Sequence, residues 1–262
     1  MGPALKPFQN IAALFALTAA LLPAGRAGAL DPSHYTVTLE GRCRPGADGA
    51  TLTLRVYSSD PNFTLPDTPF QKVIKEPREK TGAAVFVRAG SPGSAGPPGK
   101  ALTENTRFLD LEDPSISETA RRLSRGKEHV EAVERFVHGH ISEKTFGIPL
   151  IPAPAVYRGR AGDCTEHTVL AVALLRRMGI PARAVVGMIY SEEFEGMRDV
   201  YVFHMWAEAF HRGQWVLVDA TRPGAKQPSR YIAFTYHNLK SEAPLAYLGA
   251  LSALKNLRVT CP

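Results

Sequence analysis

One segment, residues 162–181, restricts the fold more than any other part of the chain. Its first residues are polar, residues 169–178 are almost all apolar, and a Gly-Ile-Pro sequence at residues 179–181 ends the run. An apolar run of this length, bounded in this way, predicts a helix that is buried around most of its circumference. The first turn of this buried helix carries a cysteine, Cys164.

Cys164 is placed where a helix favours a negative charge. The first N–H groups of a helix have no partner within it, and the helix macrodipole is positive at that end. We therefore expect the Cys164 thiol to ionise more readily than the thiol of a free cysteine. A thiolate in such a place is a nucleophile that needs a neighbouring base.

The candidate base is His204, which lies in an aromatic and apolar stretch. This stretch predicts a strand over residues 202–210, and a second strand over residues 214–219 follows it. Arg212 and Gly213 lie between the two and supply the residues of a tight turn. The two strands should therefore pair as a hairpin.

The register of this hairpin brings a carboxylate to the histidine. If the turn is Arg212-Gly213, Phe210 faces Trp215, and His204 lies diagonally to Asp219 on one face of the sheet. The carboxylate can then orient the imidazole and stabilise its protonated form. Cys164, His204 and Asp219 form a candidate catalytic triad.

Each of these three residues also has a purely structural explanation. A free cysteine is usually a small buried hydrophobe, and a histidine in an apolar strand is often a hydrogen-bonded core residue. An aspartate at a strand end often stabilises a turn. The three together, with the cysteine opening a buried helix and the other two on adjacent strands, are harder to attribute to packing alone.

A zinc site is the alternative that the other histidines suggest. His138 and His140 are close in sequence, and Cys164 and His167 lie on one face of the predicted helix, where a triad residue could complete a ligand set. Catalytic zinc sites rarely mix ligands in this way, and the triad explains more of the residues. We therefore expect neither a metal ion nor another cofactor.

These motifs resemble the transglutaminase-like superfamily of papain-like cysteine enzymes, in its bacterial branch. Residues 160–168 and 174–183 are similar to that family's nucleophile helix and to the strand start that follows it. Residues 204–208 and 215–221 are similar to its histidine and aspartate strands. The resemblance covers about residues 105–225 of the chain.

The resemblance implies a nucleophilic Cys164, a general base and acid in His204, and an orienting Asp219. It also implies an α+β fold in which the nucleophile helix packs on an antiparallel sheet. One departure from the family pattern is Met205, where a small residue is more usual, and this residue could alter the substrate channel without touching the triad.

The expected chemistry is acyl transfer on an amide through a thioester on Cys164. Release of the acyl group to water makes a protease or amidase, and release to an amine makes a crosslinking enzyme. The oxyanion needs fixed donors, of which the Cys164 N–H is the first candidate. Tyr157, Trp206 and His167 are further candidates for oxyanion or substrate contacts.

The rest of the chain predicts an accessory region around this core. Residues 30–112 contain short alternating stretches separated by turn residues, which predict a β-rich accessory domain. Residues 113–225 would be the catalytic core, with a helix over residues 127–140. Residues 226–262 would form an extension packed on the core, with a strand at residues 257–260.

The first residues of the chain predict a signal peptide at residues 1–29. Lys6 precedes an apolar run at residues 11–22, and Ala27-Gly28-Ala29 has the small residues that signal peptidase reads. The run is shorter than the roughly 20 residues of a membrane-spanning helix, so we expect no stable membrane insertion after cleavage. The mature protein would be periplasmic or extracellular.

Charge and cysteine content agree with export. Removal of the leader, with Lys6 and Arg26, takes the formal charge from +6 to +4, spread without a Lys/Arg cluster, so no nucleic-acid partner is expected. Cys43 and Cys261 remain besides Cys164 and would pair as a disulfide in an oxidising compartment, although two unrelated thiols are the alternative. We expect a monomer with a protein or peptide substrate.

Two classes of function remain open from the sequence. The first is an active exported thiol enzyme on peptide or side-chain amides, hydrolytic because water is the default acceptor in an exposed groove, with transglutaminase-type crosslinking as its alternative. The second is a catalytically silent binding or scaffold protein of the same fold, since an occluded cysteine would leave the same motifs.

Overall fold

The computed structural model describes residues 34–46, 51–75, 78–79, 82–91, 93, 95–145, 150–224, 226–237, 239–240, 254 and 256–262. Residues 32–262 form one compact unit, and the expected signal peptide lies outside the described residues. The strands are β1 (Thr36–Glu40), β2 (Leu52–Ser58), β3 (Gln71–Lys75), β4 (Arg78–Glu79), β5 (Gly82–Ala89), β6 (Ala182–Phe194), β7 (Met197–His211), β8 (Gln214–Val218), β9 (Tyr231–His237) and β10 (Leu257–Thr260). The helices are α1 (Pro114–Leu123), α2 (His129–His140), α3 (Ala153–Gly159) and α4 (Cys164–Arg177), with short 3-10 helices η3 (Lys100–Leu102) and η4 (Pro228–Arg230).

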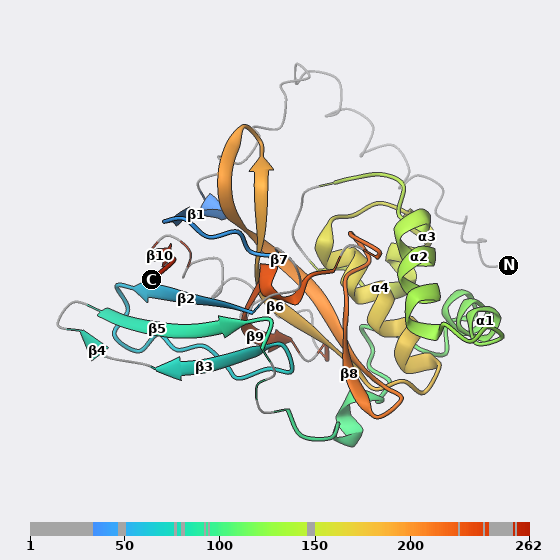
Figure 1. Cartoon of the computed structure of the whole chain (residues 1–262). Helices are drawn as coiled ribbons and strands as arrows, with labels where there is room; N and C mark the ends of the chain where they lie inside the picture. The colour runs from blue at the N-terminus through green and yellow to red at the C-terminus, as the bar shows by residue number, and fades with distance from the viewer. Residues whose placement is uncertain are drawn as a thin grey trace, which may run out of the picture. The chain divides into compact units, whose positions relative to one another are not determined.

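The strands form one sheet in the order β3-β5-β2-β10-β1-β7-β6-β9, with β4 paired to β5 and β8 paired to β7. The two ends of this order meet through Gln71 of β3. Its side-chain amide donates to the Ala233 carbonyl of β9 at 3.1 Å and accepts the Ala233 N–H at 2.9 Å. The helices lie on one side of β6 and β7, and β2, β3 and β5 lie on the other (Figure 1). This α+β architecture is the predicted fold class.

Helix α4 begins at Cys164, as predicted, because a capping box fixes its start. The Asp163 carboxylate accepts the Thr165 N–H at 2.8 Å, and the Glu166 carboxylate accepts the Asp163 N–H at 2.9 Å. This exchange satisfies donors that a helix start leaves without partners. After the last turn, Gly179 adopts a φ of 76°, the left-handed conformation that glycine tolerates best.

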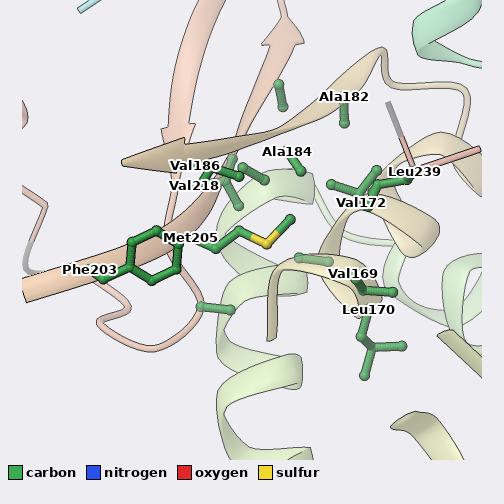
Figure 2. Packing of buried hydrophobic residues seen from close by; sticks show 14 of the residues in the cluster. Val169, Leu170, Val172, Ala182, Ala184, Val186, Phe203, Met205, Val218 and Leu239 are labelled. Carbon is green, nitrogen blue, oxygen red and sulfur yellow. The ribbon is translucent and has the colours of Figure 1, made fainter. Parts of the chain in front are cut away.

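α4 is buried on nearly all sides because other elements surround it. α1, α2 and α3 pack against it, and β6 and β7 cover its remaining side. Figure 2 shows Met205 of β7 pointing into this core, among Val169 and Val172 of α4 and Ala184 of β6. Met205 is fully buried, so its side chain does not face an exposed groove, and an effect on the substrate channel stays a prediction. No helix within the described ranges has the length and apolar character needed to cross a membrane.

β7 and β8 form the hairpin that the sequence predicts. Arg212 and Gly213 have φ values of 51° and 81°, the positive values that a two-residue type I′ turn requires. Phe210 faces Trp215 across the hairpin, which confirms the predicted register. Asp219 comes directly after the last residue of β8, where the chain leaves the sheet.

The two ends of the described chain meet in the middle of the sheet. β1 and β10 are parallel, with Leu39 opposite Val259, and β10 also pairs with β2. Cys43 and Cys261 follow β1 and β10 and form a disulfide, with their Cα atoms 6.1 Å apart. The structure thus contains the predicted pair, and the bond joins the start of the described chain to its end.

Strands from the three expected regions share this one sheet. β1 of residues 30–112 pairs with β7 of residues 113–225 and with β10 of residues 226–262. The strand predicted at residues 257–260 is observed as β10. Backbone hydrogen bonds therefore join the regions, and their division into separate domains stays a prediction.

Candidate active site

Cys164 occupies the first helical position of α4 and is partly buried, and it is a free thiol. The chain reaches it through Gly162, where any side chain would collide with that of Glu166. Within the helix, the Thr168 hydroxyl donates to the Cys164 carbonyl at 2.7 Å. The helix start therefore holds the cysteine in one place, with its backbone N–H at the positive end of the macrodipole.

An acidic residue, Glu166, lies in the first turn of α4. It is buried, and burial raises its pKa, as does the neighbouring Asp163, to about 7. Near neutral pH its carboxyl group is therefore partly protonated. Glu166 then adds less negative charge to the first turn of α4 than an exposed glutamate would, which favours an anion on Cys164.

His204 of β7 links the helix to the carboxylate. Its Nε2 lies 2.8 Å from Oδ2 of Asp219, which leaves Nδ1 as the ring nitrogen available to the thiol of Cys164. Burial lowers the pKa of His204, but Asp219 and, less strongly, Cys164 raise it to about 10. The surroundings of this imidazole therefore favour its protonated form.

Asp219 is almost fully buried and has all its carboxylate oxygens bonded. Oδ2 accepts from His204 and from the Tyr231 hydroxyl, each at 2.8 Å. Oδ1 accepts the Thr221 N–H at 3.0 Å and the Thr221 hydroxyl at 2.6 Å. Burial raises the pKa of Asp219, but His204 and these donors hold it well below its usual range. Asp219 is thus a fixed anion behind the imidazole.

Trp206 and His167 lie close to the triad. The Trp206 ring stacks beside the His204 ring, with centroids 6.2 Å apart and 18° between the planes. Its buried indole N–H has no partner among the described residues. His167 is one helical turn from Cys164, and its Nδ1 lies 2.6 Å from the Asp163 carbonyl. Burial lowers the pKa of His167, so it is a neutral ring that donates to that carbonyl.

Tyr157 of α3 contacts the neighbouring helices. Its hydroxyl lies 3.3 Å from the Thr119 hydroxyl of α1, and its ring lies 4.4 Å from the ring of His140. The described contacts of Tyr157 are thus with α1 and α2. A part in oxyanion binding stays a prediction for Tyr157, Trp206 and His167, and the first of the three lacks a described contact with the triad.

The histidines of the zinc alternative bind backbone carbonyls. Nδ1 of His138 lies 3.1 Å from the Ala220 carbonyl, and Nε2 of His140 lies 2.7 Å from the Tyr157 carbonyl. Across the described part of the chain, no group of three or more His, Cys, Asp or Glu side chains could hold a metal ion.

Three residues that sequence reasoning did not single out contact Asp219. Thr221 stands two residues after it, a spacing typical of side chains that bond to a turn. Glu134 interrupts the apolar stripe of α2, and this charged residue among valines was a readable signal. Tyr231 carried no signal, because only the pairing of β6 with both β7 and β9 brings it near.

Comparison with known proteins finds a family model that matches the part of the chain that carries this site. A sequence model of the Transglutaminase-like superfamily matches residues 116–220, and a search of curated proteins finds no match. A candidate cysteine protease from Cytophaga hutchinsonii has a TM-score of 0.51 at 16% identity, over 80% of this chain and 86% of that chain. The periplasmic domain of TgpA from Pseudomonas aeruginosa has a TM-score of 0.43 at 18% identity, over 74% and 87%. The first of these similarities shows a shared fold.

Proposed function

We propose that the chain is an exported thiol enzyme of the transglutaminase-like superfamily, whose sequence model matches residues 116–220, and that it hydrolyses peptide or side-chain amides. The observation that carries the proposal is the grouping of Cys164, His204 and Asp219. A free cysteine opens a buried helix, and it faces a histidine whose other ring nitrogen is bonded to a buried aspartate. This is the arrangement that activates a nucleophile through an oriented base.

The reaction divides into two halves. In the first, the Cys164 sulfur attacks the amide carbonyl carbon, and the tetrahedral oxyanion is held by the backbone N–H of Cys164 at the start of α4. His204 then gives its Nδ1 proton to the departing nitrogen, the C–N bond breaks, and an amine leaves behind a thioester.

In the second half, His204 is neutral and accepts a proton from water as that water attacks the thioester carbon. The C–S bond breaks, the carboxylic acid departs, and the thiolate–imidazolium pair is restored. Throughout both halves Asp219 keeps its negative charge, because its oxygens accept from Thr221 and Tyr231 as well as from His204.

Export is supported by the Cys43–Cys261 disulfide, since such bonds persist in oxidising compartments. The predicted signal peptide at residues 1–29 supports the same proposal from the sequence. A periplasmic or extracellular location and a monomeric state belong to this proposal, with a protein or peptide as substrate.

The test is the pH dependence of Cys164 alkylation by iodoacetamide. With the other two cysteines bonded to each other, label on the protein reports Cys164 alone. We expect labelling of the wild type to persist well below the reference thiol pKa of about 8.5. The His204→Ala protein should lose this labelling below pH 7, and Cys164→Ser should not be labelled.

A second measurement separates hydrolysis from crosslinking and from a silent fold. A denatured protein is incubated with the enzyme and a fluorescent primary amine, and peptides and incorporated amine are both measured. New peptide termini or released ammonia without incorporated amine support hydrolysis, whereas incorporated amine supports crosslinking. Slow alkylation of Cys164, together with the absence of both products, contradicts the enzymatic proposal.

A further inference from the structure

Helix α2 holds the segment that carries Asp219 with two polar side chains. Oε1 of Glu134 accepts the Asp219 N–H at 2.8 Å, and Nδ1 of His138 lies 3.1 Å from the Ala220 carbonyl. Residues four apart on a helix lie on one face, so both side chains reach the same stretch of backbone. α2 thus contacts the first two residues after β8, Asp219 and Ala220.

This contact matters because the sheet does not hold Asp219. The last pair of the β7–β8 ladder is Ala207 with Val218, and Asp219 lies one residue beyond it. Its N–H therefore bonds to Glu134 instead of to a neighbouring strand. Without that acceptor, the Asp219 N–H would lose its hydrogen-bond partner, and the Asp219 carbonyl would keep its bond from the Arg222 N–H at 3.1 Å.

Glu134 is itself almost fully buried, and an unpaired carboxylate there would be costly. Lys226, on the same connection between β8 and η4 as Asp219, places its Nζ 2.7 Å from Oε1 and 2.6 Å from Oε2 of Glu134. Burial raises the pKa of Glu134, and Lys226 acts against this rise. Because Lys226 balances the charge of Glu134, the Glu134 and Asp219 carboxylates can lie close together.

We propose that Glu134, neutralised by Lys226, is a positioning residue of the triad: its oxygen fixes the Asp219 backbone so that the carboxylate faces His204. The inference rests on the proposed function. It assigns no contact with substrate to Glu134. A displacement of about 1 Å in a catalytic group can cost about a hundredfold in rate, so the hydrogen bond to Asp219 should be visible in the chemistry of Cys164.

The groups that surround Asp219 come from four elements and define what the test must hold constant. They are His204 of β7, Tyr231 of β9, His167 of α4 and Glu134 of α2, with Lys226 on the connection. A useful variant therefore removes the acceptor oxygen and leaves no buried charge unpaired.

The test compares two double variants, Glu134→Gln/Lys226→Met and Glu134→Leu/Lys226→Met. Both remove the charge pair, but only the glutamine keeps an oxygen for the Asp219 N–H. Replacement of a buried ion pair by apolar residues of similar size is often tolerated, so both should fold. Should the leucine protein fail to fold, Glu134→Met/Lys226→Met takes its place, and thermal unfolding monitors each protein.

The readout is the acidic limb of Cys164 alkylation by iodoacetamide, which needs no substrate. We expect the glutamine protein to keep the wild-type limb, and the leucine protein to begin reacting about 1 pH unit higher, since a misplaced Asp219 stabilises the imidazolium less. On a substrate, its kcat should fall about tenfold with KM unchanged. Glu131→Gln, an exposed glutamate on the same helix, should match the wild type.

The outcomes are distinct. If Cys164 alkylation begins at the same pH in the glutamine and leucine proteins, the positioning inference is overturned and the proposed function stands. A glutamine protein as impaired as the leucine protein also overturns it, because the acceptor oxygen would then not be the part that matters. A wild-type protein without reactive Cys164 at low pH refutes the proposed function and this inference together.

Discussion

Two acid–base pairs lie on one face of strand β7, and each joins a buried carboxylate to a basic side chain. His204 and Glu208 are four residues apart, so they share a face of the sheet. His204 lies 2.8 Å from Asp219, and Glu208 lies 2.7 Å from Arg183 of β6. In each pair the carboxylate is 1% exposed.

The pairs differ in whether the cation can give up its proton. A guanidinium stays charged at every accessible pH, whereas an imidazole can lose its proton. Arg183 is also held between two rings, 4.2 Å from the Trp215 centroid and 3.8 Å from that of Tyr236. One pair therefore joins β6 to β7 permanently, and the other can pass a proton to a neighbour.

Each pair also receives one tyrosine from β9. The Tyr231 hydroxyl donates to Asp219 at 2.8 Å, and the Tyr236 hydroxyl accepts from Arg183 at 2.9 Å. The geometry of a buried, tyrosine-bonded ion pair is thus no mark of catalysis by itself. What distinguishes the His204 pair is the free thiol of Cys164, which interacts with the His204 ring.

The largest effect should come from neutralising the two carboxylates in turn. Asp219→Asn removes the charge that favours the imidazolium, and we expect alkylation of Cys164 at pH 6 to slow about a hundredfold, because a free thiol is about 1% thiolate or less at that pH. Glu208→Gln should leave that rate within about twofold, since Arg183 does not contact the thiol's partner. Equal slowing in both proteins would contradict the distinction between the pairs.

The second effect concerns the stability that the Arg183–Glu208 pair provides. Glu208→Gln leaves the largely buried Arg183 without a counter-charge, and we expect it to lower the free energy of unfolding by about 3 kcal/mol. Urea unfolding of both proteins at pH 7 measures this. An exposed control, Glu131→Gln, should lie within about 0.5 kcal/mol of the wild type.

The third effect is a pH dependence that only the His204 pair should produce. Its pKa is about 10 in the folded protein and about 6.5 in an unfolded chain. The stability it contributes is fully present below about pH 6.5 and is lost as the pH rises through about 10. The Tm should therefore fall between pH 7 and 10, and this part of the fall should be missing in His204→Gln.

Arg183 supplies the control for that measurement. A guanidinium keeps its proton across the same range, so Arg183→Gln should lower the Tm by a similar amount at pH 7 and pH 10. If the wild type and His204→Gln lose stability in parallel as the pH rises, the high pKa of His204 is contradicted.

The comparison also shows how far the sequence determines the site. The period of two in a strand and the positive-φ turn at Arg212 and Gly213 were enough to predict the register that brings His204 to Asp219. The start of α4 followed from a polar stretch before an apolar run. These are local rules, because the partners are close in the chain or share one hairpin.

What could not be predicted depends on contacts between distant segments. Met205 departs from the family pattern, which suggested an effect on the substrate channel, but alternation along β7 turns its side chain into the core against α4. Tyr231 and Glu134 reach Asp219 only after β9 pairs with β6 and α2 packs on α4. Nothing in the sequence spacing fixes such distances, so only the assembled fold reveals these partners.

The smallest and sharpest comparison uses the two tyrosines of β9. Tyr231→Phe removes one of the hydrogen bonds that hold the pKa of Asp219 low, so that pKa should rise. A depressed carboxyl pKa gives stability that is present above the unfolded value and lost as the pH falls. Tyr231→Phe should therefore cost about 1.5 kcal/mol at pH 7 and shift acid unfolding to higher pH.

Tyr236→Phe removes a bond to a cation that does not titrate in this range. We expect it to cost about 1 kcal/mol at pH 7, with no shift of the acid limb of Cys164 alkylation. Tyr231→Phe should move that limb upward, because Asp219 then takes up its proton at higher pH. Identical limbs in the two phenylalanine proteins would mean that Asp219 does not need its tyrosine to hold the imidazolium, and that the two pairs differ only in their cations.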